Sequence, residues 1–110
     1  MASHIDNPGF VELFLTLATE TSDRTHPARH WIARRYDQIV RDEMERLETS
    51  AANGRIRRMT TAEREFEARC MFAVMDGLEL QWIADPTIDL VHLFDLHYEA
   101  TVQSWRIPNE

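Results

Sequence analysis

The chain has 110 residues, of which 44% are hydrophobic and 28% are charged, with only 3 Gly and 4 Pro. This is one domain's worth of an ordinary soluble composition biased toward helix, and a domain of this size buries a modest core. The formal net charge of −7 makes the chain alone a poor binder of DNA, because phosphates repel an acidic surface. No apolar run reaches the roughly 18 residues of a membrane span, and the single cysteine, Cys70, excludes an intramolecular disulfide. We therefore expect a cytoplasmic protein without a signal peptide.

The first expected helix begins at Asn7-Pro8, where Asn suits the N-cap and Pro the first helical position. Residues 1–6 carry no pattern and are expected to be disordered or derived from cloning. An apolar face follows at helical spacing, and Ser22-Asp23 should end the helix; the face consists of Phe10, Leu13, Phe14 and Leu17.

The second expected helix begins at His26-Pro27 and stops at Asn53-Gly54, because glycine is typical just after a helix. Its apolar stripe is Ile32, Tyr36, Ile39, Val40 and Leu47. A break near residues 33–35 is left open by the pattern.

Two further helices complete the chain. Thr60 and Glu63 have the spacing of a capping box and open a third helix, which runs to about Ala84 and is stopped by Asp85-Pro86. Thr87 is expected to cap a fourth helix that reaches about Trp105. With no strand pattern, the predicted fold class is all-α: an antiparallel domain of four main helices.

The third and fourth helices carry more apolar surface than one small core can hide. On a helical wheel their apolar arcs each span about 220°, whereas an ordinary surface helix needs an arc somewhat over 100°. Large exposed apolar patches mark interaction sites. We therefore predict a twofold homodimer in which these two helices and their symmetry mates form an intersubunit four-helix bundle.

Gly77 lies inside the third helix, where glycine costs about 1 kcal/mol relative to alanine. It forms a strip of small side chains with Ala73 and Ala84, and two interpretations stay open: the strip accommodates the partner subunit, or it accommodates the fourth helix of the same chain. The candidate interface residues are Phe66, Ala73, Gly77, Leu80, Ala84, Leu93, Leu96 and Ala100.

Other polar residues are assigned structural roles. Arg55, Arg57 and Arg58 are expected to form a solvated turn. Asp76 and Glu79 fall on the polar side of the third helix, where Asp76 is expected to pair with Arg69 or with an arginine of the second helix.

We expect neither catalysis nor a metal or cofactor. His26 and His30 are four residues apart, but Pro27 puts His26 at the helix cap, which spoils the geometry for a shared metal ion. The chain contains no Ser-His-Asp order, no glycine-rich phosphate loop and no metal-ligand spacing.

Several phrases resemble the C-terminal regulatory domain of the tetracycline-repressor (TetR) family of transcriptional regulators. They are "FVELFLTLATETSDRTHPA", "HPARHWIARRYDQIVRDEMERL" and above all "DGLELQWIADPTIDL". The resemblance extends from about Pro8 to Trp105, so residues 7–107 would be the regulatory domain and residues 108–110 a tail. It implies a dimeric bacterial regulator, usually a repressor, that releases operator DNA when a small molecule binds. The helix-turn-helix of roughly 45 to 50 residues that would read the operator does not occur in this chain.

The resemblance also implies a small-molecule pocket for an apolar or aromatic effector whose polar end meets Tyr36 or the Trp82 indole. The candidate lining residues are Phe10, Leu13, Phe14, Leu17, Trp31, Tyr36, Met71, Met75, Leu78 and Trp82. The alternatives are that these residues form a filled core, and that the chain is a stand-alone helical dimerisation module that binds neither ligand nor DNA.

Overall fold

The computed structural model describes residues 16, 26 and 28–108. Across residues 28–108 it is all-helical and has no strand, with helices α3 (Arg29–Ala52), α4 (Thr61–Ala84) and α5 (Leu90–Ser104). The all-α class is thus confirmed for the described part of the chain. The first expected helix and the disordered segment 1–6 fall, apart from residue 16, outside the described residues, so the count of four helices stays a prediction.

Helix α3 is continuous and shows no break at residues 33–35. Its N-cap is Ala28, two residues later than predicted; the ring Nδ1 of His26 accepts a hydrogen bond from the Ala28 N–H at 3.1 Å. At the other end Gly54 takes a positive φ of 74°. The N–H groups of Gly54 and Arg55 donate to the carbonyls of Ala51 and Ser50, which is the Schellman arrangement that ends a helix. The predicted stop is confirmed.

Helix α4 begins with the predicted capping box. The Thr60 hydroxyl accepts from the Glu63 N–H at 3.1 Å, and the Glu63 carboxylate accepts from the Thr60 N–H at 3.0 Å. Two N–H groups that have no partner within the helix are thereby satisfied. The helix ends at Ala84, as the Asp85-Pro86 pair predicted.

Helix α5 begins two residues later than predicted, and Thr87 is not its cap. The cap is Asp89, whose carboxylate accepts from the His92 N–H at 3.2 Å. Thr87 instead donates its N–H and its hydroxyl to Asp85, at 3.1 and 2.6 Å. Thr87 is therefore hydrogen-bonded within the turn after α4, and Asp89 caps the next helix.

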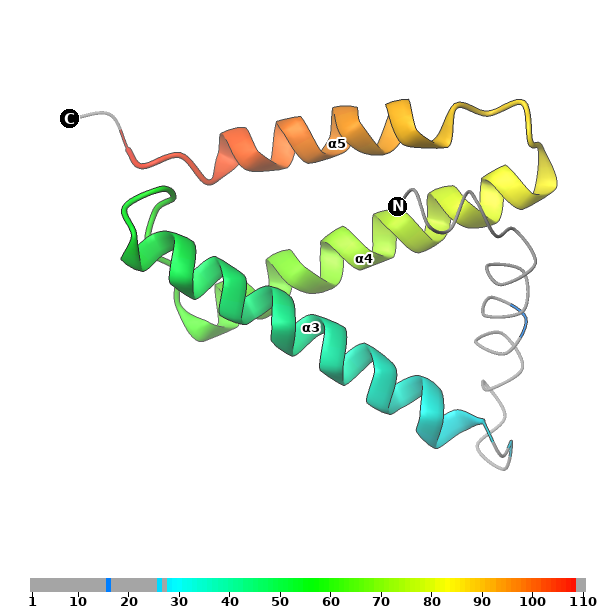
Figure 1. The fold of residues 1–110 in the computed structure, drawn as a ribbon, viewed down its shortest axis with the longest axis horizontal. Coiled ribbons are helices and arrows are strands. Elements are labelled where there is room, and N and C mark those ends of the chain that lie inside the picture. The colour runs from blue at the N-terminus through cyan, green and yellow to red at the C-terminus, as the bar shows by residue number, and fades with distance from the viewer. Residues whose placement is uncertain (1–15, 17–25, 27, 109–110) are drawn as a thin grey trace.

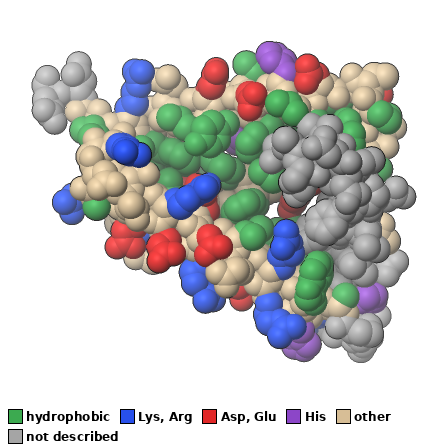
Figure 2. Space-filling view, viewed as in Figure 1, with side chains coloured by type: hydrophobic (Ala, Val, Ile, Leu, Met, Phe, Trp, Pro, Cys, Tyr) green, Lys and Arg blue, Asp and Glu red, His purple; other side chains and the backbone are tan. Residues whose placement is uncertain are grey.

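Helix α4 lies between the other two helices: it packs against α3 on one side and runs antiparallel to α5 on the other (Figure 1). Hydrophobic side chains gather where α5 lies beside α4, whereas charged side chains line the free edges of α3 and α5 (Figure 2). A hydrophobic core closes one end of the helices. It consists of Leu47, Met59, Met71 and Trp105, with Ile56, Phe94 and Val102 packed against it.

The side of α4 that the wheel assigned to polar residues is not all solvated. Glu79, expected there, is only 2% exposed. Ala68, on the same side, is fully buried, and Phe72 and Asp76 line depressions that they share with α3 residues. Because α4 is apolar around much of its circumference, its pattern alone does not identify the side that packs against α3.

Candidate functional site

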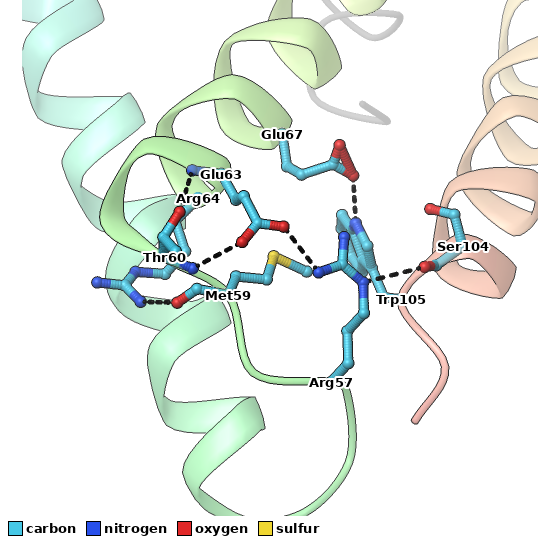
Figure 3. Close-up of polar contacts among 8 residues, drawn as sticks. All are labelled: Arg57, Met59, Thr60, Glu63, Arg64, Glu67, Ser104 and Trp105. Carbon is cyan, nitrogen blue, oxygen red and sulfur yellow. Dashed lines mark hydrogen bonds and ion pairs between the residues drawn. The ribbon is translucent and has the colours of Figure 1, made fainter. Parts of the chain in front are cut away.

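The loop between α3 and α4 fastens the end of α5 to the start of α4 (Figure 3). The Arg57 N–H donates to the Trp105 carbonyl at 2.8 Å, and its guanidinium donates to Glu63 at 2.9 Å and to the Ser104 carbonyl at 3.4 Å. The Trp105 indole N–H donates to Glu67 of α4. Arg57 is therefore a structural link rather than part of a solvated turn, while Arg55 and Arg58 are exposed as expected. This junction positions α5 beside α4.

One face of α4 is apolar and open to solvent. Its residues recur at steps of four and three, the spacing of a helix-packing seam. We call the set the outer face of α4: Phe66, Cys70, Ala73, Gly77, Leu80 and Ala84. Gly77 is half-buried and the other five are exposed, with Phe66 at 63% and Leu80 at 56%. The buried Met71 lies on the side of α4 that faces the hydrophobic core.

Helix α5 has a corresponding apolar face. The outer face of α5 is Leu93, Leu96 and Ala100, all exposed. The buried Leu90 and the half-buried Phe94 and His97 lie on a neighbouring side of the helix.

The two outer faces border one groove of about 380 Å³ between the helices. Phe66 and Cys70 of α4 line it together with Ala100 and Ser104 of α5. The two apolar faces therefore meet at this groove, through Phe66 and Cys70 of α4 and Ala100 of α5. All eight interface residues predicted from the sequence lie on these two faces.

Gly77 distinguishes between the two interpretations of the small-residue strip. A Cβ atom built on Gly77 would meet, among the described residues outside its own stretch of helix, no atom within 4 Å. Helix α5 is described throughout, so this glycine is not needed to accommodate the fourth helix of the same chain. That interpretation is wrong for Gly77.

The structure describes six of the ten predicted ligand-binding residues. Phe10, Leu13, Phe14 and Leu17 lie outside the described residues. Trp31 is exposed near the start of α3, and Met75, Leu78 and Trp82 are half-buried along α4. Met71 packs in the core against Leu47, Met59 and Trp105, so one predicted pocket residue already has apolar partners.

Tyr36 joins α3 to α4. Its half-buried hydroxyl donates a hydrogen bond to the carboxylate of Asp76. Burial raises the Tyr36 pKa far above its ordinary value, and the hydrogen bond and negative charge of Asp76 and the charge of Glu79 raise it further, against an opposing effect of Arg35. The hydroxyl therefore stays protonated and remains a donor.

Arg69, one of the predicted partners of Asp76, pairs with Glu65 at 2.9 Å. Two open depressions, of about 620 and 230 Å³, lie between α3 and α4 and share Phe72. Of the predicted ligand-binding residues that the structure describes, Tyr36 alone lines either of them.

No three His, Cys, Asp or Glu side chains within the described residues come together as a metal-binding group. None of the helices in the described part combines the length and apolarity that crossing a membrane requires. Comparisons with protein-family models, with curated proteins and with solved structures give no match for this chain.

Proposed function

We propose that this chain is the effector-binding and dimerisation domain of a TetR-type transcriptional regulator, and that it dimerises through the outer faces of α4 and α5. The observation that carries the proposal is that both faces are apolar and exposed and that they meet at one groove between the helices. Burying apolar surface stabilises an assembly by about 25 cal/mol per Å², so two such faces favour association.

The exposed side chains of the described residues support a partner. Four large apolar side chains on the two outer faces are at least 40% exposed: Phe66, Leu80, Leu93 and Leu96. Large exposed apolar patches mark interaction sites. A second copy of this chain is the occupant with the matching apolar face.

The regulatory part of the proposal rests on the resemblance and on the contact between α3 and α4. Operator DNA would be read by a helix-turn-helix domain outside this chain. The effector would bind along the half-buried side of α4, with the Tyr36 hydroxyl oxygen, whose proton is donated to Asp76, as an acceptor for its polar end. A ligand that changes the affinity for DNA by a factor of 100 requires a coupling free energy of about 2.7 kcal/mol between the two sites. A ligand-induced change in the packing of α3 against α4 would provide this coupling.

A matched pair of substitutions tests dimerisation. Leu93 and Val91 are both 40% exposed on α5, on different sides of the helix. Leu93→Glu should convert a dimer into a monomer in sedimentation velocity, because it places a charge in an apolar interface. Val91→Glu should leave the dimer intact. Equal behaviour of the two variants would contradict the proposed interface.

Thermal-shift screening with hydrophobic and amphipathic compounds tests the effector site. A ligand at 100 times its Kd should stabilise the fold by about 2.7 kcal/mol. Tyr36→Phe should weaken binding of compounds with a polar end and spare the purely apolar ones. An absence of stabilisation across a broad panel would contradict the effector site.

The packing of Met71 in the core favours a second candidate, a helical dimerisation module with a filled interior. A chain that sediments as a dimer and is stabilised by no compound would support this candidate over the first.

A further inference from the structure

The outer face of α4 is long enough to form an interface by itself. It spans 18 residue steps from Phe66 to Ala84, which is about 27 Å of helix. None of its six residues is charged. The face therefore offers a continuous apolar strip on the central helix of the three.

The order of large and small side chains along this strip is self-complementary. A twofold interface requires that, if one residue contacts a second, the second contacts the first on the other copy. When two copies of α4 are aligned antiparallel about a point between Ala73 and Gly77, each large side chain faces a small one. Phe66 faces Ala84, Leu80 faces Cys70, and Ala73 faces Gly77.

The centre of this alignment is also where the helices can approach most closely. Gly77 and Ala73 present small side chains at this point, and no described atom outside the same stretch of helix lies within 4 Å of where a Cβ on Gly77 would be. Glycine in a helix interior is disfavoured by about 1 kcal/mol relative to alanine, and close approach of another backbone is one of its common uses.

We propose that the two copies of α4 cross antiparallel at Ala73 and Gly77 in the dimer, with the partner's Leu80 packed against Cys70. The proposal rests on the dimerisation proposed above and specifies which helix each copy of α4 contacts. The copies of α5 then pair on the flank of this crossing. The competing arrangement, in which α4 packs against the partner's α5, would bring Cys70 beside the partner's Ala100.

Disulfide trapping tests the crossing with the native cysteine as one member of the pair. A disulfide requires Cα atoms within about 7 Å of each other. Positions 70 and 80 of one helix are separated by ten residues, or about 15 Å, so they cannot bridge within a chain. Oxidation of Leu80→Cys should therefore give a covalent dimer on a non-reducing gel, about tenfold faster than oxidation of Val91→Cys, whose new thiol lies off the outer face.

The other outcomes separate the two proposals. The unsubstituted chain should not crosslink, because the two Cys70 residues would lie about 15 Å apart along the crossing. If Leu80→Cys sediments as a dimer but crosslinks no faster than Val91→Cys, the antiparallel crossing is wrong and the dimer stands. A covalent dimer from Ala100→Cys in place of Leu80→Cys would establish the competing arrangement. A chain that sediments as a monomer overturns both proposals.

Discussion

Apolar side chains build both the junction of the three helices and the outer faces of α4 and α5. The two regions differ in how far these side chains are exposed to solvent. At the junction, Trp105 is 4% exposed and its indole is hydrogen-bonded to Glu67. On the outer face, Leu80 is 56% exposed. The junction is completed within one chain, whereas the outer faces become buried only against another surface. Substitutions at the junction should therefore act at every protein concentration, and substitutions on the outer faces only where dimers form.

The largest expected effect is at the junction. Trp105→Ala removes a buried aromatic side chain that packs with Leu47, Met59 and Met71, and such changes cost about 3–5 kcal/mol. Urea unfolding followed by circular dichroism should show this loss in the free energy of unfolding at low and high protein concentration alike.

The matched variant is Leu80→Ala. Exposed side chains contribute within about 0.5 kcal/mol, so in dilute, monomeric protein this substitution should change little, and its cost should grow as the concentration rises. The comparison between the two regions fails if Leu80→Ala is equally costly under dilute conditions.

Substitutions of Gly54 and Gly77 have expected effects of intermediate size. Gly54 has a φ of 74°, a conformation that costs an alanine roughly 1–2 kcal/mol, so Gly54→Ala should destabilise the fold. Gly77 is helical, and the described residues leave space for a Cβ there, so Gly77→Ala should stabilise dilute monomeric protein by about 1 kcal/mol. A thermal melt of each variant shows whether the melting temperature falls or rises. A lower melting temperature of monomeric Gly77→Ala would mean that the strip has a partner within the chain.

The smallest expected effect is a pH dependence at the junction. The Thr60 N–H, and then the Arg57 guanidinium, hold the pKa of Glu63 below its ordinary value of 4.5. Because the folded-state pKa is depressed, this contribution to stability is present above pH 4.5 and is lost as the pH falls through the folded-state pKa. Glu63→Gln should lose part of the acid-dependent decline in the free energy of unfolding. Glu48→Gln, on the exposed side of α3, is the control for the loss of one charge and should keep that decline.

Helix ends were predictable where a local motif decides them. The capping box at Thr60 and the glycine at Gly54 act through hydrogen bonds and backbone conformation that the neighbouring residues fix, and both predictions are confirmed. The start of α5 was misplaced because Thr87 and Asp89 are both good caps. The choice between them depends on Asp85, whose carboxylate accepts the hydrogen bonds of Thr87.

The direction in which an apolar helix faces was less predictable. The wheel correctly grouped the outer-face residues of α4, because spacing alone defines a common side. It placed Trp105 in the same broad arc as the outer face of α5, although Trp105 is buried in its own chain. It also placed Glu79 on a solvated side, although Glu79 is buried. The spacing of apolar residues does not indicate which element covers a given side of a helix. The covering element depends on contacts between segments far apart in the sequence.

The central claim is that the outer faces of α4 and α5 are covered by a second copy of this chain. Sedimentation equilibrium of the unsubstituted protein tests it most directly. We predict the mass of a dimer, twice 12.9 kDa, at micromolar concentration. A single species of 12.9 kDa at high micromolar concentration would contradict the claim.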